Sequence, residues 1–400
     1  MNVTIEPGLL RGSVTPPPSK SHVHRLLIAS ALCDQETAIF CPGDNADIQA
    51  TIRCLQALSA SVQKDGQILR ICGPLKDAQT RELDCGESGS TLRFLLPLCA
   101  VLAKRQPITL IGHGRLPSRP NGPLLEAMRK NGADIEGDFL PLSVCGGLKA
   151  GEYDLPGNIS SQYFTGLLMA LPLLNGESYL RYTSPLESRP YVDLTLSVLQ
   201  SFGIRVQENK DGWRIYGNQT YLSPRHIRAE GDWSAAAFWH SANYLGSDVQ
   251  LGGMDENSSQ GDKAIGRLLQ QIGQEMDLSD TPDLMPILSV VAAASPGTTE
   301  ISGAARLRLK ESDRLSAMCQ VIRALGGQAE EKEDGLIIRG GPLQGGVIDG
   351  MNDHRVVMSA AIAATVCKHP VTILGVEAAD KSYPGFFEDF ARLGGKIHVG

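Results

Sequence analysis

The stretch Gly157-Asn158-Ile159-Ser160-Ser161-Gln162 is followed directly by an apolar run, Tyr163 to Leu174. Serine and asparagine are favoured where helices begin, so this stretch predicts an apolar helix that opens at a polar turn. The same arrangement occurs six times, mostly about 70 residues apart, which is typical of a repeated supersecondary unit. The six turns lie at residues 19–25, 86–91, 157–162, 231–234, 281–283 and 352–355.

Each turn is followed by a similar succession of elements. A second helix often ends at a glycine, as Leu124 to Lys130 does before Gly132. Two short strands then flank a turn, as residues 206–208 and 213–216 do around Asp211-Gly212, which is a hairpin signal. Because hairpins lie inside an alternation of helices and strands, we expect an α/β (α+β) fold with mixed sheets, its six units divided into two sets of three.

Two proline-containing segments are the candidates for crossings between domains. Pro16-Pro17-Pro18 and Ser223-Pro224-Arg225 are stiff, and no low-complexity linker separates the halves of the chain. If both are crossings, one domain is inserted into the other. We therefore predict one domain made of residues 1–18 with 227–400, and an inserted domain made of residues 19–226.

The bulk composition restricts the class of ligand. Four hundred residues suit two domains with separate cores, and 42% are hydrophobic and 20% charged. A net charge of −7 argues against a general nucleic-acid or membrane surface, so any positive site is local. Several helix N-termini with nearby cations would bind a small, multiply negative molecule.

The cysteines and the N-terminus indicate a cytoplasmic protein. The nine cysteines are scattered without a Cys-x-x-Cys pair, which argues against a disulfide framework or a zinc site and favours reduced thiols. The first residues lack the basic and apolar regions of a secretory signal. No apolar stretch is as long as a membrane span.

Two segments of the first half carry candidate anion ligands. Lys20 and Ser21 lie where the first helix begins, and Arg25 lies one turn further on the same face, so together they could neutralise a phosphate. A cap and a solvated charge are the alternative for such a pair. Arg119-Pro120 lies in a proline-rich loop, residues 112–123, which would present the cation rigidly.

Two further segments offer neutral hydrogen-bonding groups. Ser160, Ser161 and Gln162 supply three such groups at a helix start, which is more than a cap needs. The segment Ser188 to Tyr191 adds a hydroxyl, a guanidinium and a phenol in one loop. Local capping alone remains the alternative for the serines.

The second half carries dense charge at its helix starts. The segment Lys310 to Arg314 predicts a helix opening that puts Lys310 and Arg314 on one face, and Glu311 among cations could transfer a proton. An ordinary solvated face is the alternative. Asp283 begins another predicted helix, where capping is the common role of an aspartate. His354 stands beside Arg355 in the sixth turn, and Lys381 by itself resembles a surface residue.

Several catalytic motifs are missing from the sequence. It has no P-loop, no dinucleotide-binding Gly-x-Gly-x-x-Gly after a strand, no His-Glu-x-x-His and no Gly-x-Ser-x-Gly. A nucleotide, a zinc ion or a hydrolase nucleophile is therefore not expected.

The turns and loops form an ordered set that covers nearly the whole chain. Its members are Ser19 to Ser21 with Arg25, Gly86 to Arg93, Arg119-Pro120, Gly157 to Gln162, Ser188 to Tyr191, Pro282-Asp283, Leu309 to Arg314, Asn352 to Arg355 and Lys381 to Pro384. In this order the set resembles the 5-enolpyruvylshikimate-3-phosphate synthase family, the enolpyruvyl transferases of the shikimate pathway. Each match alone is weak, but the ordered set is specific.

The resemblance implies both a fold and a reaction. It implies two similar domains, each an inside-out α/β barrel of three βαβαββ units, that close around the substrates. The implied reaction transfers the enolpyruvyl group of phosphoenolpyruvate to the 5-hydroxyl of shikimate 3-phosphate by addition and elimination, on the way to chorismate and aromatic amino acids. No metal, nucleotide or other cofactor takes part, and the family suggests a cytoplasmic monomer.

The resemblance also implies roles for individual residues. The group expected to hold shikimate 3-phosphate is Lys20, Ser21, Arg25, Ser160, Ser161, Gln162, Ser188, Tyr191, Asp283, Arg306 and Lys310. The group expected to hold phosphoenolpyruvate is Lys20, Gly89, Arg119, Gln162, Arg314, Arg355 and Lys381. The expected catalytic residues are Lys20, Asp283, Glu311 and His354, with Asp283 taking the proton of the attacking hydroxyl and Glu311 protonating the methylene carbon.

Two positions depart from the family pattern. Glu87 stands where the family commonly has asparagine, and Arg306 where some members have asparagine.

Two other functional interpretations compete with this one. The sister family that acts on UDP-N-acetylglucosamine places a cysteine or aspartate before its Arg-Pro, and residues 112–123 contain neither. A non-catalytic anion-binding protein could keep Lys20 and Arg119 but would not need Asp283 and Glu311 together.

Overall fold

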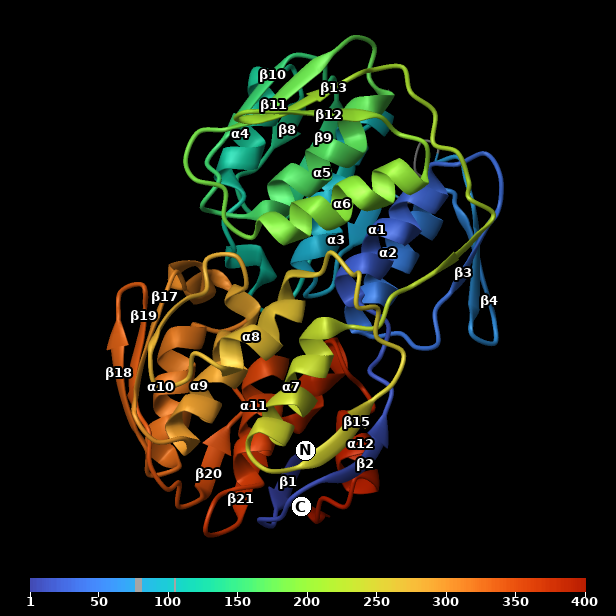
Figure 1. Cartoon of the computed structure of the whole chain (residues 1–400). Helices are drawn as coiled ribbons and strands as arrows, with labels where there is room; N and C mark the ends of the chain where they lie inside the picture. The colour runs from blue at the N-terminus through green and yellow to red at the C-terminus, as the bar shows by residue number, and fades with distance from the viewer. Residues whose placement is uncertain (76–80, 104–105) are drawn as a thin grey trace. The chain divides into compact units, whose positions relative to one another are not determined.

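The computed structural model describes residues 1–75, 81–103 and 106–400, and its chain divides into two compact units. The terminal unit comprises Met1–Pro17 with Glu230–Gly400, and the inserted unit comprises Pro18–Ala229 (Figure 1). The first crossing therefore lies inside the triple proline and the second shortly after Pro224. The bounds predicted from the sequence were 1–18 with 227–400, and 19–226.

The inserted unit alternates helices and short strands. Its helices are α1 Lys20–Ala31, α2 Ala46–Ala57, α3 Gly89–Leu102, α4 Gly122–Lys130, α5 Ser161–Ala170 and α6 Arg189–Ser201, with 3-10 turns η1 Leu116–Ser118 and η2 Leu171–Leu173. Its strands are β3 Thr37–Phe40, β4 Ser61–Asp65, β5 Ile68–Cys72, β6 Glu82–Asp84, β7 Ile108–Ile111, β8 Asp134–Glu136, β9 Leu142–Gly146, β10 Glu152–Leu155, β11 Ser178–Tyr182, β12 Val206–Asn209, β13 Gly212–Ile215 and β14 His226–Arg228.

Three four-stranded sheets of the inserted unit share one topology. Their strand orders are β14-β3-β5-β4, β6-β7-β9-β8 and β10-β11-β13-β12. In each sheet the first pair is parallel and the other two are antiparallel, as β10 is parallel to β11 while β13 runs against both β11 and β12. The expected mixed sheets with internal hairpins are thereby confirmed.

The helices that follow the polar turns form the core of the inserted unit. Helix α3 packs against α5, and α5 packs against α6, with the sheets around them (Figure 1). Helices α1, α3 and α5 are buried along most of their length, which suits helices enclosed by sheets. Two of the residues buried within them are charged, because Arg25 and Arg93 are only 2% and 4% exposed.

The terminal unit has a related composition of elements. Its helices are α7 Trp233–Tyr244, α8 Ile265–Leu269, α9 Met285–Ala294, α10 Arg314–Ala324, α11 His354–Ala364 and α12 Phe386–Arg392, with 3-10 turns η3 Gly261–Ala264, η4 Pro282–Leu284, η5 Ala305–Leu309 and η6 Val376–Lys381. Its strands are β1 Asn2–Ile5, β2 Arg11–Val14, β15 Asp248–Leu251, β16 Glu275–Asp277, β17 Thr298–Ser302, β18 Gln328–Lys332, β19 Gly335–Arg339, β20 Gly346–Asp349, β21 Val371–Leu374 and β22 Ile397–Val399.

The N-terminal strands complete the sheets of the terminal unit. Strand β1 lies between β21 and β22 in the sheet β20-β21-β1-β22, and it is antiparallel to both neighbours. Strand β2 pairs in parallel with β15, and β16-β17-β19-β18 repeats the topology seen in the inserted unit. The unit has its own apolar core, which α7, α9 and α11 largely form. Both chain ends therefore belong to one folded unit.

The helix expected to open at Lys310 begins later. Helix α10 starts at Arg314, because the side chain of Asp313 caps it by accepting a hydrogen bond from the Ser316 N–H at 3.2 Å. Lys310 and Glu311 precede the helix. The prediction that Lys310 and Arg314 share a helical face is therefore wrong, and their proximity has another cause.

Asp283 also differs from its expected position. It lies in the 3-10 turn η4, directly before α9, and the residues at the cap positions of these two elements are Thr281 and Leu284. The carboxylate is engaged instead by three cations. Capping, the common role of an aspartate at such a position, is therefore not its role here.

The structure adds findings on metals, thiols and membranes. Within residues 1–75, 81–103 and 106–400, no cluster of His, Cys, Asp and Glu side chains could hold a metal ion. All nine cysteines are free, and most of them are buried. Among the helices of the described residues, none combines the length and the apolar character needed to span a membrane.

Candidate active site

The predicted polar turns open helices in both units. In the inserted unit the caps are Ser19, Ser88 and Ser160, which open α1, α3 and α5. In the terminal unit Asp232 caps α7 and Asp353 caps α11. The aligned peptide dipoles at each of these N-termini favour a negative ligand.

In the inserted unit, Lys20 is held by a carboxylate. Its Nζ lies 3.0 Å from Asp47 Oδ2, and the two side chains are 17% and 12% exposed. Asp47 lies in the first turn of α2, where Asn45 caps the helix. Sequence reasoning missed Asp47, although the segment Asn45-Ala46-Asp47 has the residue types of a helix start.

Arg25 is surrounded by neutral acceptors. Its guanidinium donates to the Ser21 carbonyl at 2.6 Å and to the Tyr191 carbonyl at 2.9 Å. It also donates to the hydroxyls of Thr195 at 2.8 Å and Thr165 at 3.1 Å. Burial lowers the pKa of Arg25 to about 9. A buried cation whose partners are neutral favours an anionic ligand nearby.

Gln162 is fixed by Arg93, a residue that the sequence analysis did not single out. Arg93 Nη1 donates to Gln162 Oε1 at 2.6 Å, and Gln162 Nε2 donates to Ser90 Oγ at 3.0 Å. The Gln162 backbone N–H donates to Ser160 Oγ at 3.3 Å. A single arginine within the otherwise apolar run 92–102 is the sequence signal that could have identified Arg93.

Arg93 also fixes the loop that carries Arg119. Its Nη2 donates to the Pro120 carbonyl at 3.0 Å, and its Nε donates to Asn121 Oδ1 at 3.1 Å. The Tyr163 hydroxyl donates to the same Pro120 carbonyl at 2.6 Å. The rigid presentation expected for Arg119 thus depends on these contacts as well as on prolines.

Glycines permit two close approaches at the start of α3. A Cβ on Gly89 would lie 3.0 Å from Arg119 Nη1, so the missing side chain lets this guanidinium lie over the helix N-terminus. A Cβ on Gly114 would lie 2.5 Å from Glu87 Oε2, so the Glu87 carboxylate lies against Gly114. Ser188 begins α6 in the left-handed conformation and is 3% exposed.

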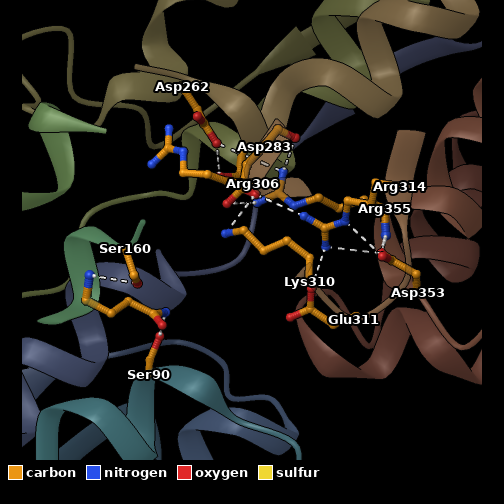
Figure 2. Close-up of polar contacts among 12 residues, drawn as sticks. Ser90, Ser160, Asp262, Asp283, Arg306, Lys310, Glu311, Arg314, Asp353 and Arg355 are labelled. Atoms are coloured by element: carbon orange, nitrogen blue, oxygen red, sulfur yellow. Dashed lines mark hydrogen bonds and ion pairs between the residues drawn. The ribbon is translucent and has the colours of Figure 1, made fainter. Parts of the chain in front are cut away.

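In the terminal unit, Arg314 is the centre of a buried ionic cluster (Figure 2). Its Nε lies 2.8 Å from Asp353 Oδ2, its Nη1 lies 2.9 Å from Asp283 Oδ1, and its Nη2 lies 2.9 Å from Glu311 Oε2. Burial opposes its charge, but the carboxylates of Asp353, Glu311 and Asp283 outweigh burial and raise its pKa. Arg314 is therefore a permanent cation.

Asp283 is surrounded by three cations. Lys310 Nζ lies 3.5 Å from its Oδ1, and Arg355 Nη2 lies 3.3 Å from its Oδ2, in addition to Arg314. Burial alone would raise the pKa of Asp283, but Arg355, Lys310 and Arg314 hold it well below its ordinary value. Asp283 is therefore an ionised carboxylate.

Asp353 organises the start of α11. Its carboxylate accepts hydrogen bonds from Ser312 Oγ and the Arg355 N–H, both at 2.9 Å, besides those from Arg314. Burial opposes its charge, yet Arg314 and then His354 lower its pKa. His354 is 3% exposed, with Nδ1 4.0 Å from Asp353 Oδ1. The sequence identified Asp353 only as part of a capping turn.

The remaining predicted residues of the terminal unit donate hydrogen bonds to backbone carbonyls. Arg306 donates to the Ser279 carbonyl, and Lys381 donates to the Asn352 carbonyl at 2.8 Å. Arg355 Nη1 donates to the Asp283 carbonyl at 2.8 Å. The cluster thus includes Asp283, Lys310, Glu311, Arg314 and Arg355, all of them candidate residues from the sequence. Asp262, whose Oδ2 lies 4.0 Å from Arg355 Nη1, was missed because no local pattern marks it.

Comparison with solved structures defines the class of fold. The structure resembles that of the enolpyruvyl transferase NikO from Streptomyces tendae with a TM-score of 0.79, over 99% of this chain and 98% of that one, at 18% sequence identity. It resembles EPSP synthase from Acinetobacter baumannii with a TM-score of 0.83 over the whole of both chains, at 26% identity. The fold is therefore that of the enolpyruvyl transferases.

Comparison of sequences identifies the family. Residues 5–390 match the family described as EPSP synthase (3-phosphoshikimate 1-carboxyvinyltransferase). The 3-phosphoshikimate 1-carboxyvinyltransferases of Clostridium perfringens and Clostridium acetobutylicum are each 41% identical to this chain, covering 98% and 99% of it and 98% of each relative. The chain belongs to the EPSP synthase family.

Proposed function

We propose that this chain transfers the enolpyruvyl group of phosphoenolpyruvate to the 5-hydroxyl of shikimate 3-phosphate and releases phosphate. Family membership supports the reaction, and the ionic cluster of Asp283, Glu311 and Arg314 supports its chemistry. This cluster is the observation on which the proposal depends most, because it places two carboxylates on one cation at the start of α10. The product leads to chorismate and the aromatic amino acids.

Asp283 and Glu311 would handle the protons of the reaction. In the addition step the 5-oxygen bonds to C2 of phosphoenolpyruvate, Asp283 takes the hydroxyl proton, and Glu311 gives a proton to C3. In the elimination step the bond between C2 and the phosphate oxygen breaks, and Glu311 takes a proton back from C3, which restores the double bond. The departing phosphate takes the proton that Asp283 holds. The fixed cations around these carboxylates would stabilise the charge that develops during transfer.

The residue assignments come from the family resemblance. The residues assigned to shikimate 3-phosphate are Lys20, Ser21, Arg25, Ser160, Ser161, Gln162, Ser188, Tyr191, Asp283, Arg306 and Lys310. Those assigned to phosphoenolpyruvate are Lys20, Gly89, Arg119, Gln162, Arg314, Arg355 and Lys381. Lys20 and His354 complete the proposed catalytic group. An arginine guanidinium can donate two parallel hydrogen bonds to one carboxylate or phosphate group. This chemistry supports the assignment of several arginines to the two substrates.

We further propose a cytoplasmic monomer that works without a metal or nucleotide. The free cysteines support a reducing compartment. The suggested monomer and the independence from cofactors come from the family resemblance alone.

Phosphate release tests the proposed reaction directly. The protein is incubated with shikimate 3-phosphate and phosphoenolpyruvate, and both phosphate and the enolpyruvyl ether are quantified. Equal amounts of the two products are expected, with none when either substrate is omitted. If the intact, folded protein releases no phosphate at any substrate concentration, the proposal is wrong and a non-catalytic anion-binding role takes its place.

A further inference from the structure

Asp262 is a buried carboxyl that the proposed reaction does not use. It lies in the turn η3 and is 2% exposed. Its Oδ2 accepts a hydrogen bond from Ser234 Oγ, whereas its Oδ1 is buried without a hydrogen-bond partner among the described residues. An ionised oxygen without a donor is costly to bury, so this environment favours the neutral acid.

Arg355 lies between two carboxylates that differ in the number of cations around them (Figure 2). Its Nη1 lies 4.0 Å from Asp262 Oδ2, and its Nη2 lies 3.3 Å from Asp283 Oδ2. Asp283 has two further cations, Arg314 and Lys310, while Asp262 has this single ion pair within the described part of the chain. When another anion engages Arg355, the ionised form of Asp262 therefore loses more electrostatic stabilisation than the ionised form of Asp283.

The charges around Asp262 come from three elements. Arg355 on α11 favours its ionised form, while Asp283 in η4 and Asp232 at the start of α7 oppose it. Burial is the largest effect and raises the pKa of Asp262 to about 6, against which Arg355 acts. Lys263, its neighbour in sequence, is bound to the Glu256 carbonyl.

We propose that Asp262 is a positioning residue that exchanges its negative charge for a proton when an anion binds Arg355, so that substrate binding and proton uptake are coupled. The proposal rests on the assignment of Arg355 to phosphoenolpyruvate above. The arriving anion replaces the carboxylate as the partner of Arg355. A solvent proton then bonds to Asp262 Oδ2, this O–H donates to Ser234 Oγ, and Oδ1 becomes a neutral carbonyl oxygen. Without this proton, binding would leave a buried charge without its cation.

The coupling has a defined sign. A ligand that binds with proton uptake binds more tightly as the pH falls, within the interval between the pKa of Asp262 in the free and in the bound protein. The free protein sets the lower limit of that interval at about pH 6. Below this limit Asp262 is already neutral, and the coupling disappears.

The test compares wild type with Asp262→Asn, whose amide imitates the neutral acid. The KM for phosphoenolpyruvate is measured at saturating shikimate 3-phosphate from pH 5.5 to 9. We expect similar values at pH 5.5 and a lower KM for Asp262→Asn at pH 8, with the ratio growing up to about ten-fold per pH unit before a plateau. The ratio cancels the ionisation of the substrate. Asp248→Asn, at an exposed position of strand β15, should follow wild type.

Parallel KM profiles for wild type and Asp262→Asn, or a higher KM for the variant at every pH, would overturn the proposal, since a purely structural role predicts such results. If wild type releases no phosphate, the proposed function fails and this proposal with it.

If Asp262→Asn does not fold, a second measurement tests the proposal. Infrared difference spectra are recorded for the Glu311→Gln variant with and without both substrates. A carboxylic-acid carbonyl band that grows on binding, and shifts when Ser234→Ala is added, is expected; no growth of this band overturns the proposal.

Discussion

Arg314 donates a hydrogen bond from Nε to Asp353 Oδ2 at 2.8 Å, and the two side chains are 1% and 0% exposed. Asp353 uses the same carboxylate to cap α11 through the Arg355 N–H. This one carboxylate therefore fixes the guanidinium that holds Asp283 and Glu311, and also the backbone of the residue that carries the next cation. The geometry of the proposed catalytic carboxylates depends on a residue that is not assigned to either substrate.

Removal of the charge of Asp353 should destabilise the fold. Asp353→Asn leaves Arg314 buried with one partner fewer, and breaking a buried ion pair costs about 3–5 kcal/mol. We expect a loss of that size in the free energy of unfolding at pH 7.5, measured by urea denaturation. Asp248→Asn is the control and should change it by less than about 0.5 kcal/mol. Equal stability of the two variants would contradict the central role of Asp353.

Replacement of either proton-transfer residue should abolish most turnover. Asp283→Asn and Glu311→Gln each keep a similar shape but remove an ionisable group, so kcat should fall about 100-fold or more. The measurement is steady-state phosphate release with both substrates saturating. A residual kcat within a factor of about three of wild type for Glu311→Gln would exclude it as the proton donor to C3.

Gly89→Ala should weaken binding of phosphoenolpyruvate through Arg119. The new Cβ would lie 3.0 Å from Nη1 and 3.1 Å from Cζ of that guanidinium, so Arg119 must move. We expect a rise of about ten-fold in the KM for phosphoenolpyruvate, corresponding to about 1.4 kcal/mol, with a smaller change in kcat. Gly122→Ala is the matched control, because no atom lies within 4 Å of its added Cβ. Identical KM values for the two variants would contradict the assignment.

Arg93→Lys should act at a distance from both substrates. Lysine cannot reproduce the guanidinium fork that joins Gln162, Asn121 and the Pro120 carbonyl. Both Gln162 and the Arg119 loop should lose their fixed positions, which lowers kcat/KM for phosphoenolpyruvate by about 10-fold to 100-fold. The exposed Arg53→Lys provides the comparison, and it should behave as wild type. A normal kcat/KM in Arg93→Lys would show that the fork is dispensable.

Asp262→Asn should stabilise the protein in a pH-dependent way. A carboxyl with a raised pKa binds protons more tightly in the folded state, so wild type loses stability as the pH rises from about 4 to about 6. The neutral amide avoids this loss. We expect the variant to be more stable by about 3 kcal/mol at pH 8 and by about half that at pH 5, from urea denaturation at both values. A stability difference that is independent of pH would refute the raised pKa.

Much of the fold could be predicted because the relevant signals are local. Hairpins such as β12–β13 follow from Asp211-Gly212, and the caps Ser19 and Ser160 follow from residue types favoured at helix starts. Local reasoning was wrong where a neighbour competed for the same role. Asp313 caps α10, so the helix begins at Arg314 and not at Lys310. Four of the five residues from Lys310 to Arg314 are charged, which made the capping residue hard to recognise in the sequence.

The candidate site was predicted less completely, because its charged partners are distant in sequence. Asp283, Lys310, Glu311, Arg314 and Arg355 had been named as candidates, yet Asp353 was seen only as part of a capping turn. Arg93 was named only as the last residue of a matched segment, and Asp47 and Asp262 were not named. Asp353 lies 39 positions from Arg314, and Gln162 lies 69 positions from Arg93. Their pairing depends on which helix starts meet, and no local pattern encodes that.

Most of the polar turns and the mixed hairpin units followed from the sequence alone, because capping, turn geometry and hydrophobic periodicity act over a few residues. The family followed from the order of the matched segments along the chain. Which charges share a partner depended on tertiary packing. It joined Arg314 to Asp353 and set Arg355 between Asp283 and Asp262. Coulomb energies and burial depend on distances and on exclusion of water, and packing creates both. The ionisation of these carboxylates is therefore a property of the folded chain.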